Sequence, residues 1–198
     1  MILDIDLLLA YGASYKKLRA GDFVFMEGDA CRFYHQLVSG KVKWISISGD
    51  GKEFIHTIVE PGESFGELPL FDDDPYAADA LAVEDSIILR LHKPVFIDLL
   101  KESSEIHFEF TRLLAEKVRF NFLLIKTISS EQPEKCISTL INYLKQKKKF
   151  ICPDCNQLKL TRQQIASMTG LRVETVIRAM RHMHVLGELK IEKGKVYC

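Results

Sequence analysis

The stretch that decides the fold is LTRQQIASMTGLRVETVIRAMRHM, residues 160–183. Its pattern predicts two helices joined by a tight turn. Thr161 can cap the first helix, and Gln164, three positions later, completes a capping box. Gly170 stands where the first helix has to end and the chain has to turn. In a helix-turn-helix that binds DNA the second helix enters the major groove, whereas an ordinary amphipathic hairpin has no such role.

The second helix is predicted to have a core face and a polar face. Four apolar residues recur at helical spacing and are expected to face the core: Val173, Val176, Ile177 and Met180. If the stretch binds DNA, the contacts come from the polar face and from the start of the first helix. We expect the DNA-binding residues to be Thr161, Arg162, Gln163, Arg172, Val173, Glu174, Thr175 and Arg178.

The net charge of zero hides an asymmetry along the chain. Residues 1–130 carry 14 Lys and Arg against 21 Asp and Glu, whereas residues 131–198 carry 13 against 6. A basic C-terminal part is typical of proteins that bind polyanions, although basic surfaces also have other uses. The charge therefore favours two domains with separate tasks, and 198 residues are enough for two modest domains.

The composition also indicates the cellular compartment of the protein. No apolar run is long enough to span a membrane, and the apolar start MILDIDLLLAYG is acidic, unlike a signal peptide. The five cysteines are odd in number and irregular in spacing, which argues against a disulfide framework. We expect a cytoplasmic protein that does not bind a membrane.

The pattern of apolar residues divides the rest of the chain. Residues 17–91 alternate short apolar stretches with glycine turns, which predicts a β-sandwich or barrel. Residues 104–129 then read as a long helix with an apolar seam, and such a seam is typical of a coiled-coil dimer interface. The expected seam residues are Phe110, Leu113, Leu114, Lys117, Asn121, Leu124 and Ile128. The alternative is packing against the chain's own sheet domain, a role that we assign to Phe120 and Phe122.

Three segments resemble the CRP/FNR family of bacterial transcription regulators. They are TRQQIASMTGLRVETVIRAM at residues 161–180, KLRAGDFVFMEGDACRFYHQLVSGKVKW at residues 17–44, and PGESFGELPLF at residues 61–71. The V-E-T-x-x-R core, residues 173–178, is closer to the FNR branch of the family. The resemblance implies an α+β protein with a double-stranded β-helix (a jelly roll like the cyclic-nucleotide-binding domain) over residues 1–103. It further implies a dimerisation helix and linker over residues 104–130, the linker being SSEQP, and a winged helix-turn-helix over residues 131–198.

The phosphate-cassette region departs from the family pattern. In members that bind cyclic AMP a glutamate takes the ribose hydroxyl and an Arg-Ser pair takes the phosphate, and these positions fall here at Glu67, Ala77 and Ala78. Aspartates surround them, no cation lies nearby in the sequence, and a phosphodiester needs a charge-assisted donor. We therefore expect no cyclic nucleotide and a structural role for Glu67. The effector pocket is nevertheless expected at Phe65, Gly66, Glu67, Leu68, Ala77 and Ala78.

The cysteines raise a redox or metal alternative. Only Cys31 precedes residue 136, so the ligands for an iron–sulfur cluster are missing and no cofactor is expected. Cys152 and Cys155 form a CxxC that fits a structural loop, a thiol switch or half of a zinc site. Zinc would need further ligands, for which His182, His184 and Cys198 are candidates. No catalytic grouping appears, so we expect no enzyme.

These observations predict a homodimeric, sequence-specific DNA-binding transcription regulator that does not respond to cyclic AMP. Its partners would be a two-fold symmetric site on double-stranded DNA and RNA polymerase. Two alternatives stay open: a β-roll module that binds a ligand or partner and has lost specific DNA binding, and a thiol-based redox regulator that uses Cys152 and Cys155.

Overall fold

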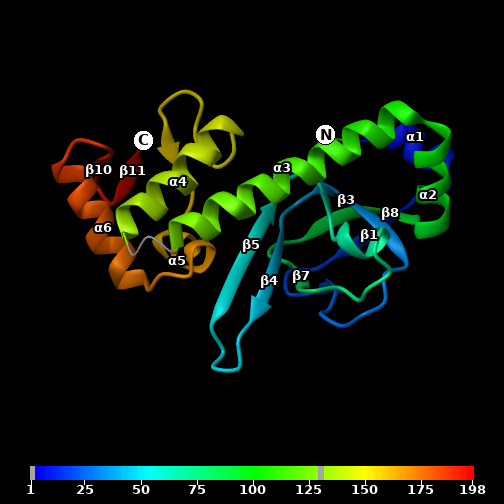
Figure 1. The fold of residues 1–198 in the computed structure, drawn as a ribbon, viewed down its shortest axis with the longest axis horizontal. Coiled ribbons are helices and arrows are strands. Elements are labelled where there is room, and N and C mark those ends of the chain that lie inside the picture. The colour runs from blue at the N-terminus through cyan, green and yellow to red at the C-terminus, as the bar shows by residue number, and fades with distance from the viewer. Residues whose placement is uncertain (1–2, 129–131) are drawn as a thin grey trace. The chain divides into compact units, whose positions relative to one another are not determined.

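The computed structural model describes residues 3–128 and 132–198, with the side chains of residues 126–128 left out (Figure 1). Ser129, Ser130 and Glu131 of the predicted linker, and the Ile128 side chain of the predicted seam, lie outside this description. The chain forms two compact units, Met1–Leu114 and Ala115–Cys198, which we call the N-terminal and C-terminal units. Their division falls inside the long helix, so the predicted boundaries at residues 103 and 131 stay a prediction.

The N-terminal unit contains two antiparallel four-stranded sheets. The first has the order β1 (Ser14–Leu18), β8 (Ser86–His92), β3 (Phe33–Ser39), β6 (Ser64–Phe65). The second has the order β2 (Phe23–Phe25), β7 (Asp79–Ala82), β4 (Val42–Ile47), β5 (Glu53–Val59). One buried cluster draws residues from both sheets, among them Leu37 of β3 and Val42 of β4. The predicted jelly roll is therefore confirmed.

Helices cover the other face of the first sheet. They are α1 (Ile5–Ala10), α2 (Lys93–Glu102) and the first part of α3 (Ser104–Ile128), and a short 3₁₀ turn, η1, spans Leu68–Leu70. Side chains alternate across a strand, so Tyr34 of β3 points to this face while Leu37 points between the sheets. The Tyr34 ring stacks on Phe96 at 4.4 Å between centroids, and Phe96 meets Phe110 of α3 at 5.3 Å.

The C-terminal unit has a helical core and a small sheet. Its elements are the rest of α3, α4 (Pro133–Gln146), β9 (Gln157–Leu158), α5 (Arg162–Thr169), α6 (Val173–Val185), β10 (Lys190–Glu192) and β11 (Lys195–Tyr197). The sheet has the order β10-β11-β9 and forms the predicted wing. The buried side chains of α4 are Cys136, Ile137, Leu140, Ile141 and Leu144.

The long helix α3, which runs from green into yellow-green in Figure 1, corrects the predicted seam. Phe110 is only 1% exposed and belongs to the core of the N-terminal unit, and Leu124 is 8% exposed. Phe120 stacks on Tyr143 of α4 at 3.7 Å between ring centroids, not on the β-roll. Phe122, predicted to pack on the β-roll, is 69% exposed. The helix is apolar on more than one face, and the chain itself buries Phe110 and Leu124 of the predicted seam, whereas Asn121 of that seam is exposed.

Within residues 3–128 and 132–198, no helix is long and apolar enough to cross a membrane.

Candidate DNA-binding surface and ligand cavity

The start of α5 is held by local hydrogen bonds. The Gln164 backbone N–H donates to Thr161 Oγ1 at 3.1 Å, and the Thr161 backbone N–H donates to Gln164 Oε1 at 2.9 Å. This is the predicted capping box, and it satisfies two backbone donors that a helix start leaves without partners. It leaves Thr161 and Gln163 exposed at the first turn, with Arg162 half-buried.

The turn to α6 depends on one left-handed residue. Gly170 ends α5 with φ 71° and ψ 0°, a conformation that side chains disfavour. The chain then reaches Arg172, which is the N-cap residue of α6 and is exposed. Helix α6 is fixed against its unit by four buried residues, which are Val176, Ala179, Met180 and Met183.

The opposite face of α6 is exposed and carries mixed chemistry. Glu174 and Arg178, both predicted as DNA contacts, lie on it, while Val173 and Thr175 are half-buried. Ile177 was predicted to face the core and is 36% exposed, so that prediction is wrong. Each residue of an α-helix turns by about 100°, which carries Ile177 from the buried line of Val176 towards the polar side. Ile177 and Arg181 are therefore two exposed residues of this face that were not among the predicted DNA contacts.

The cations of this face are available to an external partner. Among the residues that the structure describes, no acidic side chain forms an ion pair with Arg172, Arg178 or Arg181. At the far end of α6, His182 Nδ1 lies 3.1 Å from Glu134 Oε1 of α4. The Glu134 backbone amide and the His182 ring hold the pKa of the Glu134 carboxyl below its usual range. A surface with free guanidinium groups and one carboxylate suits the phosphates and base edges of DNA.

The N-terminal unit holds a cavity of about 270 Å³ at one end of the β-roll. Its polar lining includes Lys16, Arg32, His35 and Arg90. Its aromatic lining comes from Phe25, Phe33 and Tyr76, and the Phe25 and Tyr76 rings stack at 3.6 Å between centroids. The sequence analysis found no cation near the phosphate cassette, whereas the fold places three cations in a cavity with Tyr76, the residue before Ala77.

The sequence matches the family descriptions "Cyclic nucleotide-binding domain" over residues 15–103 and "Crp-like helix-turn-helix domain" over residues 134–197. Both matches coincide with the two folds described above. The chain belongs to the CRP/FNR family of transcriptional regulators. As a member of this family it is a DNA-binding transcriptional regulator.

Relatives match this CRP/FNR regulator over nearly its whole length. It is 26% identical over 193 residues to the "Cyclic AMP receptor protein" of Thermus thermophilus, covering 98% of this chain and 87% of that protein. It is 28% identical over 197 residues to the "CRP-like cAMP-activated global transcriptional regulator" of Mycobacterium tuberculosis, covering 94% and 87%. The structure of the c-di-GMP-responsive global regulator CLP of Xanthomonas campestris aligns with a TM-score of 0.76 at 19% identity, covering 98% and 96%, which shows the shared fold.

The cassette of this CRP/FNR regulator does not line the cavity that the structure contains. Glu67 is buried and accepts a hydrogen bond from Ser64 Oγ at 2.7 Å, which agrees with its predicted structural role. Phe65 and Ala78 are buried, whereas Leu68 and Ala77 are exposed. Gly66 packs beneath the Phe25 and Tyr76 rings. The predicted set of pocket residues is therefore not brought together around this cavity.

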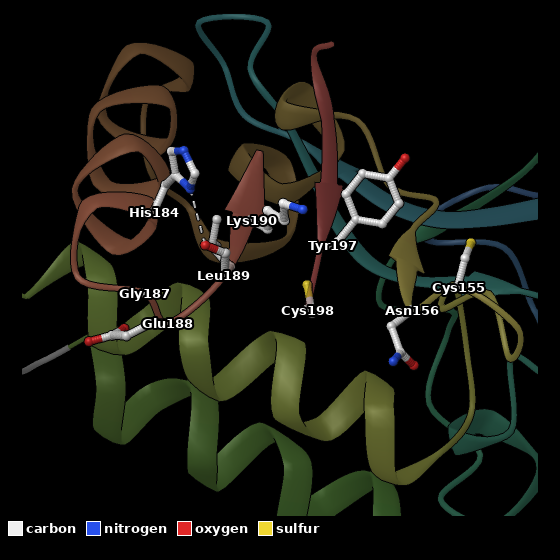
Figure 2. A pocket seen from close by; sticks show the side chains of 9 residues that line it. All are labelled: Cys155, Asn156, His184, Gly187, Glu188, Leu189, Lys190, Tyr197 and Cys198. Carbon is white, nitrogen blue, oxygen red and sulfur yellow. Dashed lines mark hydrogen bonds between the residues drawn. The ribbon is translucent and has the colours of Figure 1, made fainter. Parts of the chain in front are cut away.

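The CxxC loop of this CRP/FNR regulator joins α4 to the wing. The Cys152 sulfur accepts hydrogen bonds from the Cys155 thiol and from the backbone N–H groups of Cys155 and Asp154, which lower the pKa of Cys152. Cys155, His184 and Cys198 line one pocket, but Figure 2 shows them at separate places on its wall. In the part of the chain that the structure describes, no group of three or more His, Cys, Asp or Glu could hold a metal ion, so the zinc alternative lacks its ligand set.

Proposed function

We propose that this regulator acts in the cytoplasm as a homodimer that reads a two-fold symmetric DNA site with α6. The observation that carries the proposal is the exposed face of α6, whose arginines form no ion pair with any acidic side chain that the structure describes. A glutamate can accept a hydrogen bond from cytosine N4, and an arginine can donate to guanine or to phosphate, which are the roles of Glu174 and Arg178. Ile177, between them, would meet the methyl group of a thymine.

Contacts to the DNA sugar-phosphate backbone would fix the position of α6 along the duplex. Thr161 and Gln163 are exposed at the first turn of α5, where backbone N–H groups and side chains can reach a phosphate. Arg172 and Arg181 add positive charge at the two sides of Glu174. Val173 and Thr175 are half-buried, so their part is to support the helix start more than to read bases.

The dimer interface is assigned to an exposed stripe of α3. Its members follow each other at spacings of three and four residues, which is a heptad pattern. They are Phe108, Thr111, Ala115, Val118, Phe122 and Ile125, and all are exposed in the single chain. Phe108 is 73% exposed and Ile125 is 64% exposed. A stripe this apolar is costly to leave in water, and a second copy of the same helix offers the matching surface.

Cyclic AMP is not the effector in this proposal. The two alanines at positions 77 and 78 offer no charge-assisted donor to a cyclic phosphate, and Glu67 is already occupied by Ser64. We further propose RNA polymerase as a partner of the DNA-bound dimer.

Selection of duplexes from a random-sequence pool tests the DNA proposal. The expected outcome is a palindromic motif whose half-site centres lie about one helical turn apart, roughly 34 Å. A selected motif without two-fold symmetry would contradict the proposal. No selected motif at all would instead favour the alternative of a β-roll module that has lost specific DNA binding.

A thiol-based regulator is the second candidate, because the Cys152 sulfur is hydrogen-bonded to the Cys155 thiol. An oxidant of the disulfide class would join the two sulfurs by thiol–disulfide exchange: the S–S bond of the oxidant breaks, and the two electrons and two thiol protons pass to it, giving two thiols. The test is DNA affinity before and after treatment with oxidised glutathione, in wild type and in Cys152→Ser. The Cys198→Ser variant is the matched control. A change in affinity that survives in Cys152→Ser would contradict this role.

A further inference from the structure

We propose that the cavity at the end of the β-roll binds a small organic anion, a carboxylate that carries one ring. Arg90 and Lys16 would hold the carboxylate, and Phe25, Phe33 and Tyr76 would hold the ring. As an effector site this inference rests on the proposed regulatory function, but as a binding site it stands without DNA.

The polar side chains reach the cavity from three neighbouring strands. In the first sheet the order β1-β8-β3 places Lys16, Arg90 and His35 on neighbouring strands. Arg90 is paired in register with His35, and Lys16 is paired with Ile88, two residues along β8 from Arg90. Each lies two residues along its strand from an inward-facing core residue, which is Leu18, Ile88 or Leu37 respectively. Because side chains alternate along a strand, all three point to the same inner face. The inner face of the first sheet thus presents two cations, Lys16 and Arg90, and the imidazole of His35 to the cavity.

These groups lack a counterion among the residues that the structure describes. In the described ranges 3–128 and 132–198, no acidic side chain forms an ion pair with Lys16, Arg32 or Arg90. His35 Nδ1 and Arg90 Nε are buried, and neither has a hydrogen-bond partner among the described residues. Buried polar atoms are nearly always paired in folded proteins, because an unpaired one costs free energy. An anion in the cavity would supply the missing acceptor for Arg90.

The lowered pKa of His35 also reflects the positive charge in the cavity that no described acidic side chain neutralises. Burial, and then the charges of Arg90 and Lys16, lower the pKa of His35 to about 3. The ring is therefore neutral at physiological pH, and its free Nδ1 can donate or accept one hydrogen bond, depending on the tautomer. A neutral imidazole beside two cations can position a carboxylate without adding a third charge.

Size and lining define the rest of the ligand. A dry cavity of about 150 Å³ holds benzene, so about 270 Å³ suits a ring with a short acidic side chain. Phe25 and Tyr76 form a stacked aromatic wall, and the Arg90 guanidinium lies 4.9 Å from the centre of the Phe33 ring. Asp29 also lines the cavity, at an exposed position, and its carboxylate would repel a second negative charge. The preferred ligand is therefore a monoanion with an aromatic body.

Calorimetry on the full chain without DNA tests the inference. The probes are phenylacetate, its neutral match phenylacetamide, inorganic phosphate and cyclic AMP, each to millimolar concentration. We expect saturable binding of phenylacetate and none of phenylacetamide or cyclic AMP. Loss of a charge-assisted hydrogen bond should weaken phenylacetate binding about tenfold or more in Arg90→Gln and in Lys16→Gln. Lys17→Gln is the matched control, because Lys17 is exposed on the other face of β1, and it should bind as wild type does.

The outcomes separate the inference from the proposed function. No saturation by phenylacetate, equal binding of phenylacetamide, or unchanged affinity in both cavity variants would overturn the inference and leave DNA binding untouched. Binding of phosphate alone would overturn the assignment of a ring-bearing ligand. Circular dichroism checks that each variant is folded. If Arg90→Gln is unfolded, the affinities of Lys16→Gln and Lys17→Gln for phenylacetate are compared instead, and equal affinities would overturn the inference.

Discussion

Replacing Phe122 by alanine should break the dimer and leave the single chain intact. Phe122 is 69% exposed, so it contributes little to the stability of its own protomer. A phenylalanine buries about 150–250 Å² when it is fully covered, so Phe122→Ala removes roughly 100 Å² of apolar burial from each protomer of the dimer. At about 25 cal/mol per Å², this amounts to about 2.5 kcal/mol per protomer and about 5 kcal/mol per dimer. The dissociation constant of the dimer should rise by about 3.5 orders of magnitude.

Sedimentation velocity over a dilution series measures that constant. The matched control is Asn121→Ala, because Asn121 is exposed at the adjacent position and belongs to the seam that periodicity predicted. The structure-based stripe predicts a monomer for Phe122→Ala and an unchanged dimer for Asn121→Ala. An unchanged dimer in Phe122→Ala, or a larger effect in Asn121→Ala, would refute the assignment. Thermal unfolding of both variants at high dilution checks that the protomer stays folded.

Three further predictions concern reading, packing and acid stability. Glu174→Ala should relax the preference at one base pair per half-site, at a cost of about 1–3 kcal/mol in discrimination, while Arg178→Ala weakens binding more broadly; selection from a random pool shows both. Gly66→Ala should destabilise the N-terminal unit by about 1–3 kcal/mol in denaturant titration, because φ is 71° and an added Cβ would lie 2.6 Å from Phe25 Cζ. The pKa of His35 is lowered from 6.5 to about 3, so the unfolded chain binds the extra proton. Stability should therefore fall by about 1.4 kcal/mol per pH unit below the unfolded pKa, and unfolding at several pH values should show a flatter profile in His35→Phe.

The helix-turn-helix could be predicted because its signals are local. The capping box of Thr161 and Gln164 and the left-handed turn at Gly170 involve residues within a few positions of each other. Ile177 shows the limit of such a pattern. Helical spacing placed Ile177 with Val176 and Met180. The width of a helix's buried face depends on the surface that packs against it, and Ile177 lies at the edge of the buried face of α6.

The long helix and the cavity depended on contacts between distant segments. Helix α3 has apolar residues on several faces, and periodicity cannot tell which face its own chain covers. Phe110 is covered by Tyr34 and Phe96, which are distant from it in sequence. The phosphate cassette seemed to lack cations for the same reason, since Lys16 and Arg90 come from strands at opposite ends of the β-roll sequence.

The sequence by itself determined the two domains, their order along the chain, the basic C-terminal part and the helix that we propose as the DNA-reading helix. These follow from spacing, capping and charge, which act over a few residues or sum over a segment. The tertiary structure alone decided which stripe of α3 stays exposed in the single chain, which side chains surround the cavity, and that Ile177 lies on the exposed face of α6. Each of these depends on which surfaces are buried, and burial is set by segments far apart in the chain that the fold brings into contact.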